Sequence, residues 1–129
     1  MVRLAYLDTS AAMKLVVEEA ESAVLTEHLA DGRRLVASWL LHTELHCAAG
    51  RHPDDVDAES VRIVLDTVDL ADLTRGDMIA AGTYAPLRSN DAIHLAVAIR
   101  LGVDEMVTYD VELADAATAT GMAVFAPGP

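Results

Sequence analysis

The feature that most constrains the fold is an alternation of short apolar runs with longer helical segments along the chain. Apolar runs predict five strands, at residues 2–7, 35–37, 68–73, 105–109 and 122–125. Helical patterns fill the intervals, at residues 9–17, 18–30, 39–50, 58–68, 74–82, 91–101 and 110–120. Strands that are separated by helices favour a parallel sheet with helices on both faces. We therefore expect one α/β domain over residues 1–129.

Charge excludes one class of nucleic-acid-binding protein. The chain has 9 basic and 21 acidic residues and a net charge of −12, whereas proteins that grip phosphate backbones through their whole surface are basic. A polyanionic partner would need a local patch or a bound metal ion. The single cysteine, Cys47, allows no internal disulfide and is expected to be a small core residue. Without an apolar stretch long enough for a membrane span, we expect a soluble, cytoplasmic protein.

Two acidic residues follow predicted strands. Asp8 ends the first strand, and Asp110 follows the strand at residues 105–109. Open α/β sheets bind their ligands beyond the carboxyl ends of the strands, so both carboxylates are candidates for a functional site. Each acid, taken alone, is equally well explained as a helix N-cap or a solvated loop residue.

Two further acidic residues lie in unusually apolar helices. Glu44 interrupts an apolar stripe that includes Leu41 and Leu45, where a carboxylate is costly unless it is paired or metal-bound. Asp91 opens a helix that is apolar on nearly every side, where an acid also complements the helix dipole. His94, one turn later, is either a hydrogen-bond partner of Asp91 or a core residue.

The four acids together point to a metal site. If the sheet brings Asp8, Glu44, Asp91 and Asp110 to one rim, their mutual repulsion raises their pKa values or requires a cation. Ligand sets made only of oxygen suit Mg²⁺ or Mn²⁺ rather than zinc. Such sites cleave phosphodiester bonds by activating a water molecule, and the ion supplies the positive potential that this chain lacks.

Four motifs in this order resemble the PIN-domain family, and in particular the VapC toxins of bacterial toxin–antitoxin pairs. The motifs are LDTSA at residues 7–11, TEL at 43–45, DAIHLA at 91–96 and VTYD at 107–110. The resemblance covers essentially the whole chain. It implies a three-layer α/β/α sandwich with a mostly parallel sheet of four or five strands. It also implies a Mg²⁺- or Mn²⁺-dependent endoribonuclease that forms a homodimer.

The resemblance also assigns roles to residues of this chain. Asp8, Glu44, Asp91 and Asp110 match the family's acidic quartet; Asp8 and Asp91 would bind the metal directly, and Glu44 and Asp110 directly or through water. The hydroxyl positions beside the acids, read as positioning groups, are Thr9, Ser10 and Thr108. A small antitoxin of the VapB kind is expected to cover the acidic site and to insert a basic residue into it.

Other functions are less consistent with the sequence. No phosphate-binding glycine loop is present, and His42 and His46 lack the spacing of a zinc-protease motif. A receiver-type signalling domain would need a lysine after a late strand, but Lys14 is the last lysine of the chain. Lys14 itself is either a surface residue or a weak candidate for a phosphate contact. A PIN-like module that binds a partner without catalysis is the main alternative to the ribonuclease.

Overall fold

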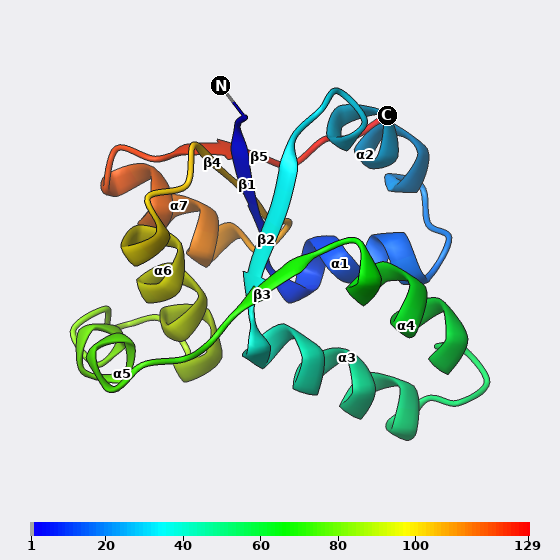
Figure 1. Cartoon of the computed structure of the whole chain (residues 1–129), viewed down its shortest axis with the longest axis horizontal. Coiled ribbons are helices and arrows are strands. Elements are labelled where there is room, and N and C mark those ends of the chain that lie inside the picture. Colours follow the sequence, from blue (N-terminus) through cyan, green and yellow to red (C-terminus); the bar gives the residue numbers. More distant parts are fainter. Residues whose placement is uncertain (1) are drawn as a thin grey trace.

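The computed structural model describes residues 2–129 and contains one five-stranded parallel sheet (Figure 1). The strand order is β3-β2-β1-β4-β5, and all four neighbouring pairs run parallel. The strands are β1 (Leu4–Leu7), β2 (Arg34–Ser38), β3 (Asp69–Ala71), β4 (Glu105–Val107) and β5 (Ala123–Phe125). The predicted parallel sheet is therefore confirmed, with every predicted strand present in a somewhat different length.

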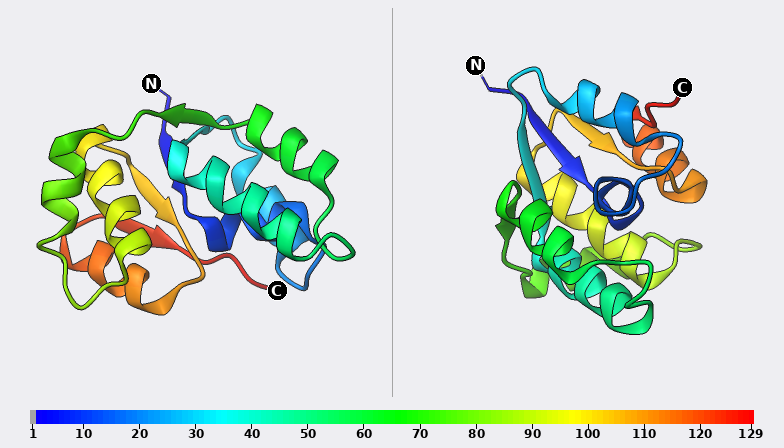
Figure 2. Two further views of the ribbon diagram at one scale, coloured as in Figure 1. Left: turned by 90° about the horizontal axis from the view of Figure 1, so that it is seen from below. Right: turned by 90° about the vertical axis from the view of Figure 1, so that its right-hand side faces the viewer.

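Seven helices cover the two faces of the sheet. Helices α1 to α4 pack against one another on one face, and α5 to α7 pack on the other (Figures 1 and 2). Their bounds are α1 (Thr9–Val16), α2 (Ser22–Leu29), α3 (Trp39–Arg51), α4 (Ala58–Asp66), α5 (Arg75–Ala81), α6 (Ser89–Leu101) and α7 (Val111–Ala119). This is the expected three-layer α/β/α arrangement. No helix among residues 2–129 has the length and apolar character needed to cross a lipid bilayer.

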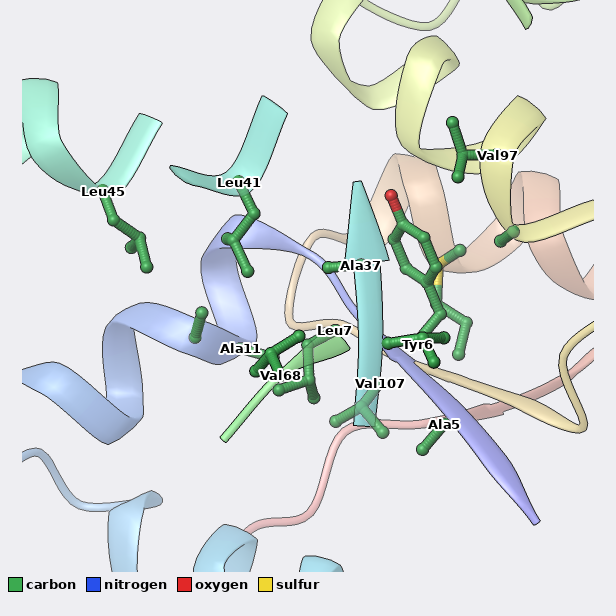
Figure 3. Packing of buried hydrophobic residues seen from close by; sticks show 14 of the residues in the cluster. Ala5, Tyr6, Leu7, Ala11, Ala37, Leu41, Leu45, Val68, Val97 and Val107 are labelled. Carbon is green, nitrogen blue, oxygen red and sulfur yellow. The ribbon is translucent and has the colours of Figure 1, made fainter. Parts of the chain in front are cut away.

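The core lies on both sides of the central strand β1. Ala5, Tyr6 and Leu7 are fully buried, and successive side chains of a strand point to opposite faces. Figure 3 accordingly shows Tyr6 on the side of Val97 in α6, with Leu41 of α3 on the opposite side. The edge strands β3 and β5 are partly exposed, as expected for strands that have one neighbour.

The direction of the strand order reverses between β1 and β4. The chain moves outward from β1 to β2 and β3, then returns to the other side of β1 to form β4 and β5. The loops that follow β1 and β4 diverge at such a point and leave a crevice at the carboxyl ends of the strands. Asp8 and Asp110 follow these two strands and cap α1 and α7 through their side chains.

Three local predictions need correction. Helix α2 begins at Ser22 instead of residue 18, and Cys47 is exposed rather than buried in the core. Helix α6 begins at Ser89, two residues earlier than predicted, because Arg88 has the extended backbone of an N-cap residue. Asp91 consequently lies inside the first turn of α6 instead of at its cap.

Candidate functional site

The four acidic residues that the sequence singles out line one pocket. The pocket has a volume of about 420 Å³ and lies at the carboxyl ends of the strands. It is lined by Asp8, Thr9, Ser10, Glu44, Arg88, Ser89, Asn90, Asp91 and Asp110. The acids come from four separate segments: the ends of β1 and β4, the middle of α3, and the first turn of α6.

Asp8 is the most firmly held of the four carboxylates. Only 2% of the residue is exposed, and its Oδ1 accepts a hydrogen bond of 2.9 Å from the backbone N–H of Ala11 in the first turn of α1. Burial raises the pKa of Asp8, while hydrogen bonds from Thr108, Ala11 and Ser10 favour its ionised form. The carboxylate is therefore fixed by the helix that it caps.

Two hydroxyl groups join Asp8 to the loop after β4. Thr108 donates a hydrogen bond of 2.6 Å to Asp8 Oδ2, and Ser10 Oγ lies 2.7 Å from Oδ1 and 2.9 Å from Oδ2. The Ser10 hydroxyl also accepts the backbone N–H of Tyr109 at 2.8 Å. Both hydroxyl groups therefore hold Asp8 in place, and Thr108 is fully buried behind the pocket wall.

Glu44 is held by a second set of donors. Its Oε1 lies 2.7 Å from both Thr9 Oγ1 and His94 Nε2, and its Oε2 lies 3.4 Å from Asn90 Nδ2. Burial acts to raise the pKa of Glu44, but the hydrogen bonds and the charge of His94, aided by Thr9, hold it below its usual value. The apolar stripe of α3 thus carries a carboxylate that is paired rather than isolated.

Asp91 and Asp110 leave more of their carboxylate oxygens open to the pocket. Asp110 Oδ1 accepts the backbone N–H of Leu113 at 2.9 Å, whereas the Asp91 carboxylate accepts no hydrogen bond from any of residues 2–129. Burial, followed by the charges of Asp110 and Asp8, raises the pKa of Asp91. Asp91 therefore carries the uncompensated negative charge of the site.

The donor set fits a hard divalent cation in chemistry and charge. All four acids offer oxygen ligands, which Mg²⁺ and Mn²⁺ prefer. Among residues 2–129, however, no three His, Cys, Asp or Glu side chains are grouped tightly enough to hold a metal ion in their present positions. Three direct side-chain ligands would require the acidic side chains to move toward one another, whereas Mg²⁺ is usually held by one or two carboxylates together with water molecules.

Other candidate residues lie outside the pocket. Lys14 pairs with Glu19 and Glu21, each at 3.2 Å, and lies over the ring of Tyr109. Asp115, one turn past Asp110, is exposed and does not line the pocket. His42 and His46 lie against each other with their ring centroids 4.5 Å apart, outside the pocket.

The sequence interpretation missed part of the wall and one pairing. Arg88, Ser89 and Asn90 line the pocket because α6 begins before Asp91. An earlier start of α6 was signalled by Ser89 and Asn90, which both favour helix N-termini. His94 contacts Glu44, not Asp91 as considered above, and nothing in the spacing of the two residues reveals this contact.

Comparison with known sequences gives consistent results. The sequence model of the PIN domain matches residues 5–119. Ribonuclease VapC46 of Mycobacterium tuberculosis is 40% identical over 126 residues, which cover 95% of this chain and 96% of the relative. Ribonuclease VapC47 of the same species is 35% identical over 131 residues, with 95% and 96% coverage.

Solved structures with the same fold have more distant sequences. Mycobacterium tuberculosis VapC20, described as a toxin that cleaves the sarcin–ricin loop, superimposes with a TM-score of 0.72 and 15% identity, covering 95% of this chain and 99% of that one. A chain of a toxin–antitoxin complex from Klebsiella pneumoniae superimposes with a TM-score of 0.71 and 20% identity, with 95% and 97% coverage. At this identity the similarity establishes the fold.

Proposed function

Because the chain belongs to the PIN-domain family and to its VapC branch, we propose that it is a metal-dependent endoribonuclease and the toxin of a type II toxin–antitoxin pair. The single observation that carries the proposal is the convergence of Asp8, Glu44, Asp91 and Asp110 on one pocket. Relatives with 35–40% identity over 95% of the chain are named ribonucleases, which supports RNA as the substrate.

The proposed roles of the acids follow from the resemblance of their motifs to those of the family. Asp8 and Asp91 are the proposed direct ligands of Mg²⁺ or Mn²⁺, with Glu44 and Asp110 contributing directly or through water. When bound, the ion supplies Lewis acidity that activates a water molecule and stabilises charge on the leaving oxygen of the phosphodiester. The acids accept hydrogen bonds and hold the water in place, and Asp91 brings the negative charge that attracts the cation.

The remaining residues of the pocket bind and orient the substrate. Arg88 is exposed on the pocket wall and forms no ion pair among residues 2–129, so its guanidinium is free to contact a phosphate. Ser10 and Thr108 keep Asp8 in one orientation, and Thr9 does the same for Glu44. An RNA strand thus meets one basic side chain beside a pocket of acids.

Inhibition by a partner is the second part of the proposal. A protein with a net charge of −12 and an acidic pocket attracts a basic peptide. Structural relatives include toxins in complex with antitoxins, one of them bound to a promoter DNA fragment. We infer that a VapB-like antitoxin inserts an arginine or lysine among the carboxylates, and that the toxin acts as a homodimer in the cytoplasm.

Cleavage of structured RNA by the purified protein tests the enzymatic proposal. We expect cleavage with Mg²⁺ or Mn²⁺, none with EDTA, and a loss of at least 100-fold in Asp8→Asn and Asp91→Asn. Equal cleavage by the parent and Asp8→Asn would indicate a contaminating nuclease and contradict the proposal. Without cleavage by any form, a binding module without catalysis becomes the better explanation.

The antitoxin complex provides an independent test. Titration calorimetry with the basic C-terminal segment of the antitoxin should show weaker binding to Asp8→Asn and Asp91→Asn than to the parent, with the loss reduced at high salt. A complex that is indifferent to both substitutions would contradict the insertion of a basic residue. Light scattering during gel filtration measures the expected dimer directly.

A further inference from the structure

His94 connects the wall of the acidic pocket to the core of the protein. It lies on α6, one turn after Asp91, and only 1% of it is exposed. Its Nε2 lies 2.7 Å from Oε1 of Glu44 on α3, and its Nδ1 lies 2.7 Å from the hydroxyl of Tyr6 on β1. The imidazole therefore joins two helices that cover opposite faces of the sheet to its central strand.

The carboxylate of Glu44 fixes the direction of one of these hydrogen bonds. An ionised carboxylate only accepts hydrogen bonds, so the N–H group at Nε2 of His94 donates to Glu44. The hydroxyl of Tyr6 can both donate and accept, and it is the partner of Nδ1. Tyr6 is fully buried and its ring meets that of His94 edge to face, with centroids 5.7 Å apart. This packing holds the imidazole in one orientation.

The result is an asymmetric carboxylate at Glu44. Its Oε1 is held by two close donors, from His94 and Thr9, both at 2.7 Å. Its Oε2 has only the distant amide of Asn90, at 3.4 Å on the pocket wall. A glutamate side chain has considerable rotamer freedom, which is costly to restrict at the moment of ligand binding. The donors on Oε1 restrict it beforehand and leave the second oxygen for a ligand.

We propose that His94, held by Tyr6, is a positioning residue that orients Glu44 so that Oε2 contributes to divalent-cation binding in the pocket. The proposal rests on the proposed function, because it needs a cation at the four acids. It goes further by assigning a role to a buried histidine outside the acidic quartet. Partners that orient metal ligands typically contribute 10- to 100-fold to metal affinity.

Mn²⁺ binding to the protein without RNA tests this role, with free Mn²⁺ measured by electron paramagnetic resonance. His94→Leu removes the donor and should weaken Mn²⁺ binding by about tenfold or more. His94→Gln keeps an N–H group near the position of Nε2 and should bind within about threefold of the parent, since the amide replaces the donated hydrogen bond. Val97→Ala, on the same helix and equally buried, is the matched control for packing and should leave Mn²⁺ affinity unchanged.

Cleavage kinetics distinguish a positioning role from a structural one. In His94→Leu, kcat should fall at low Mn²⁺ concentration and recover as the concentration rises, because mass action offsets a weakened metal site. The KM for RNA should stay unchanged. If His94→Leu fails to fold, Tyr6→Phe serves instead. This variant keeps the ring, removes the hydroxyl partner of Nδ1, and should weaken Mn²⁺ binding by about threefold, which is less than the effect of a direct partner because Tyr6 acts on Glu44 only through His94.

The outcomes separate this proposal from the proposed function. A parent protein that binds Mn²⁺, together with a folded His94→Leu of equal affinity, would overturn the role of His94 and leave the metal site intact. If His94→Leu were unfolded, equal Mn²⁺ affinity of Tyr6→Phe and the parent would overturn it as well. A parent protein that binds no Mn²⁺ would instead contradict the proposed metal site itself, and with it the role of His94.

Discussion

The hydroxyl of Thr108 donates a 2.6 Å hydrogen bond to the buried carboxylate of Asp8, and this bond joins the segments that follow the neighbouring strands β1 and β4. Asp8 receives further hydrogen bonds from Ser10 and from the backbone of Ala11. Asp91, across the pocket, receives none from residues 2–129. The site therefore combines one carboxylate that the fold stabilises with another that the fold leaves uncompensated.

Thr108→Val tests the hydrogen bond that holds the carboxylate of Asp8. Valine keeps the shape of threonine but removes the donor to Asp8, which leaves a buried carboxylate with one hydrogen bond fewer. We expect the free energy of unfolding to fall by about 1–3 kcal/mol, measured by urea denaturation, and RNA cleavage to fall as well. Thr118→Val is the matched control, because Thr118 is exposed and its hydroxyl contacts only the carbonyl of Ala114. Equal stability of the two variants would contradict the importance of this bond.

Asp91→Asn tests the uncompensated negative charge of Asp91. Burial and the neighbouring acids Asp110 and Asp8 disfavour the ionised form of Asp91, so a neutral amide should stabilise the metal-free protein by about 0.5–2 kcal/mol. The same substitution should abolish cleavage. Thermal unfolding in EDTA measures the increase in stability of the metal-free protein. Asp115→Asn, on the exposed side of α7, is the control. A destabilised Asp91→Asn protein would contradict the repulsion among the acids.

The stability that Asp91→Asn is expected to gain over the parent depends on pH in a definite direction. A carboxyl group with a raised pKa binds its proton more tightly in the folded protein than in the unfolded chain, where its value is near 3.8. Its destabilising effect is complete above the raised pKa and disappears as the pH falls toward 3.8. The stability difference between Asp91→Asn and the parent should therefore be largest near pH 7 and shrink in acid. A difference that grows on acidification would contradict this assignment.

Arg88→Ala tests the proposed contact with the RNA backbone. Loss of one phosphate contact worth about 1 kcal/mol should raise KM about fivefold with little change in kcat. It should also reduce the slope of log affinity against log salt by about one. Arg3→Ala is the control, because Arg3 is an exposed arginine that precedes β1 at the opposite end of the strand. Identical salt slopes for both variants would exclude the contact.

An ion pair outside the acidic pocket contributes to the stability of the fold. Asp77 is buried in the capping box of α5, and Arg100 of α6 contacts both its oxygens, at 2.8 and 3.0 Å. Arg100 lowers the pKa of Asp77, so this pair stabilises the fold above pH 4 and loses its effect as Asp77 is protonated in acid. Arg100 is partly exposed, which reduces its contribution through solvent screening.

Arg100→Met should therefore cost about 1–3 kcal/mol of unfolding free energy at pH 7 and leave cleavage unchanged. Arg62→Met, which breaks exposed pairs with Glu59 and Asp66, is the matched control and should change the stability much less. The expected ranking would be wrong if Arg62→Met were the more destabilised protein in chemical denaturation.

The sequence predicts the scaffold and the acids well because both depend on local patterns. An acid that directly follows an apolar run caps the next helix, and this rule places Asp8 and Asp110 at the same sheet edge. Glu44 stands out because it interrupts an apolar stripe. These signals predict the acidic part of the pocket wall, while the function of the acids and the ion that would occupy the pocket stay predictions.

The contacts that fix the acids escape prediction because they join distant segments. His94 and Asp91 are helix neighbours three residues apart, which suggests that they interact. The structure pairs His94 with Glu44 and Tyr6, 50 and 88 residues away. Cys47 shows the same limitation, since its small size predicts burial but its position on α3 leaves it exposed. Tertiary packing decides both cases.

The placement of β1 between β2 and β4 also determines when the site comes into existence during synthesis. Asp8 is made early, but the strand that carries Thr108 and Asp110 to its side begins only at Glu105. A growing chain therefore contains no assembled pocket until the segment with Thr108 and Asp110 has left the ribosome. If the proposed function is correct, we expect a product that ends before β4 to leave the surrounding RNA uncut.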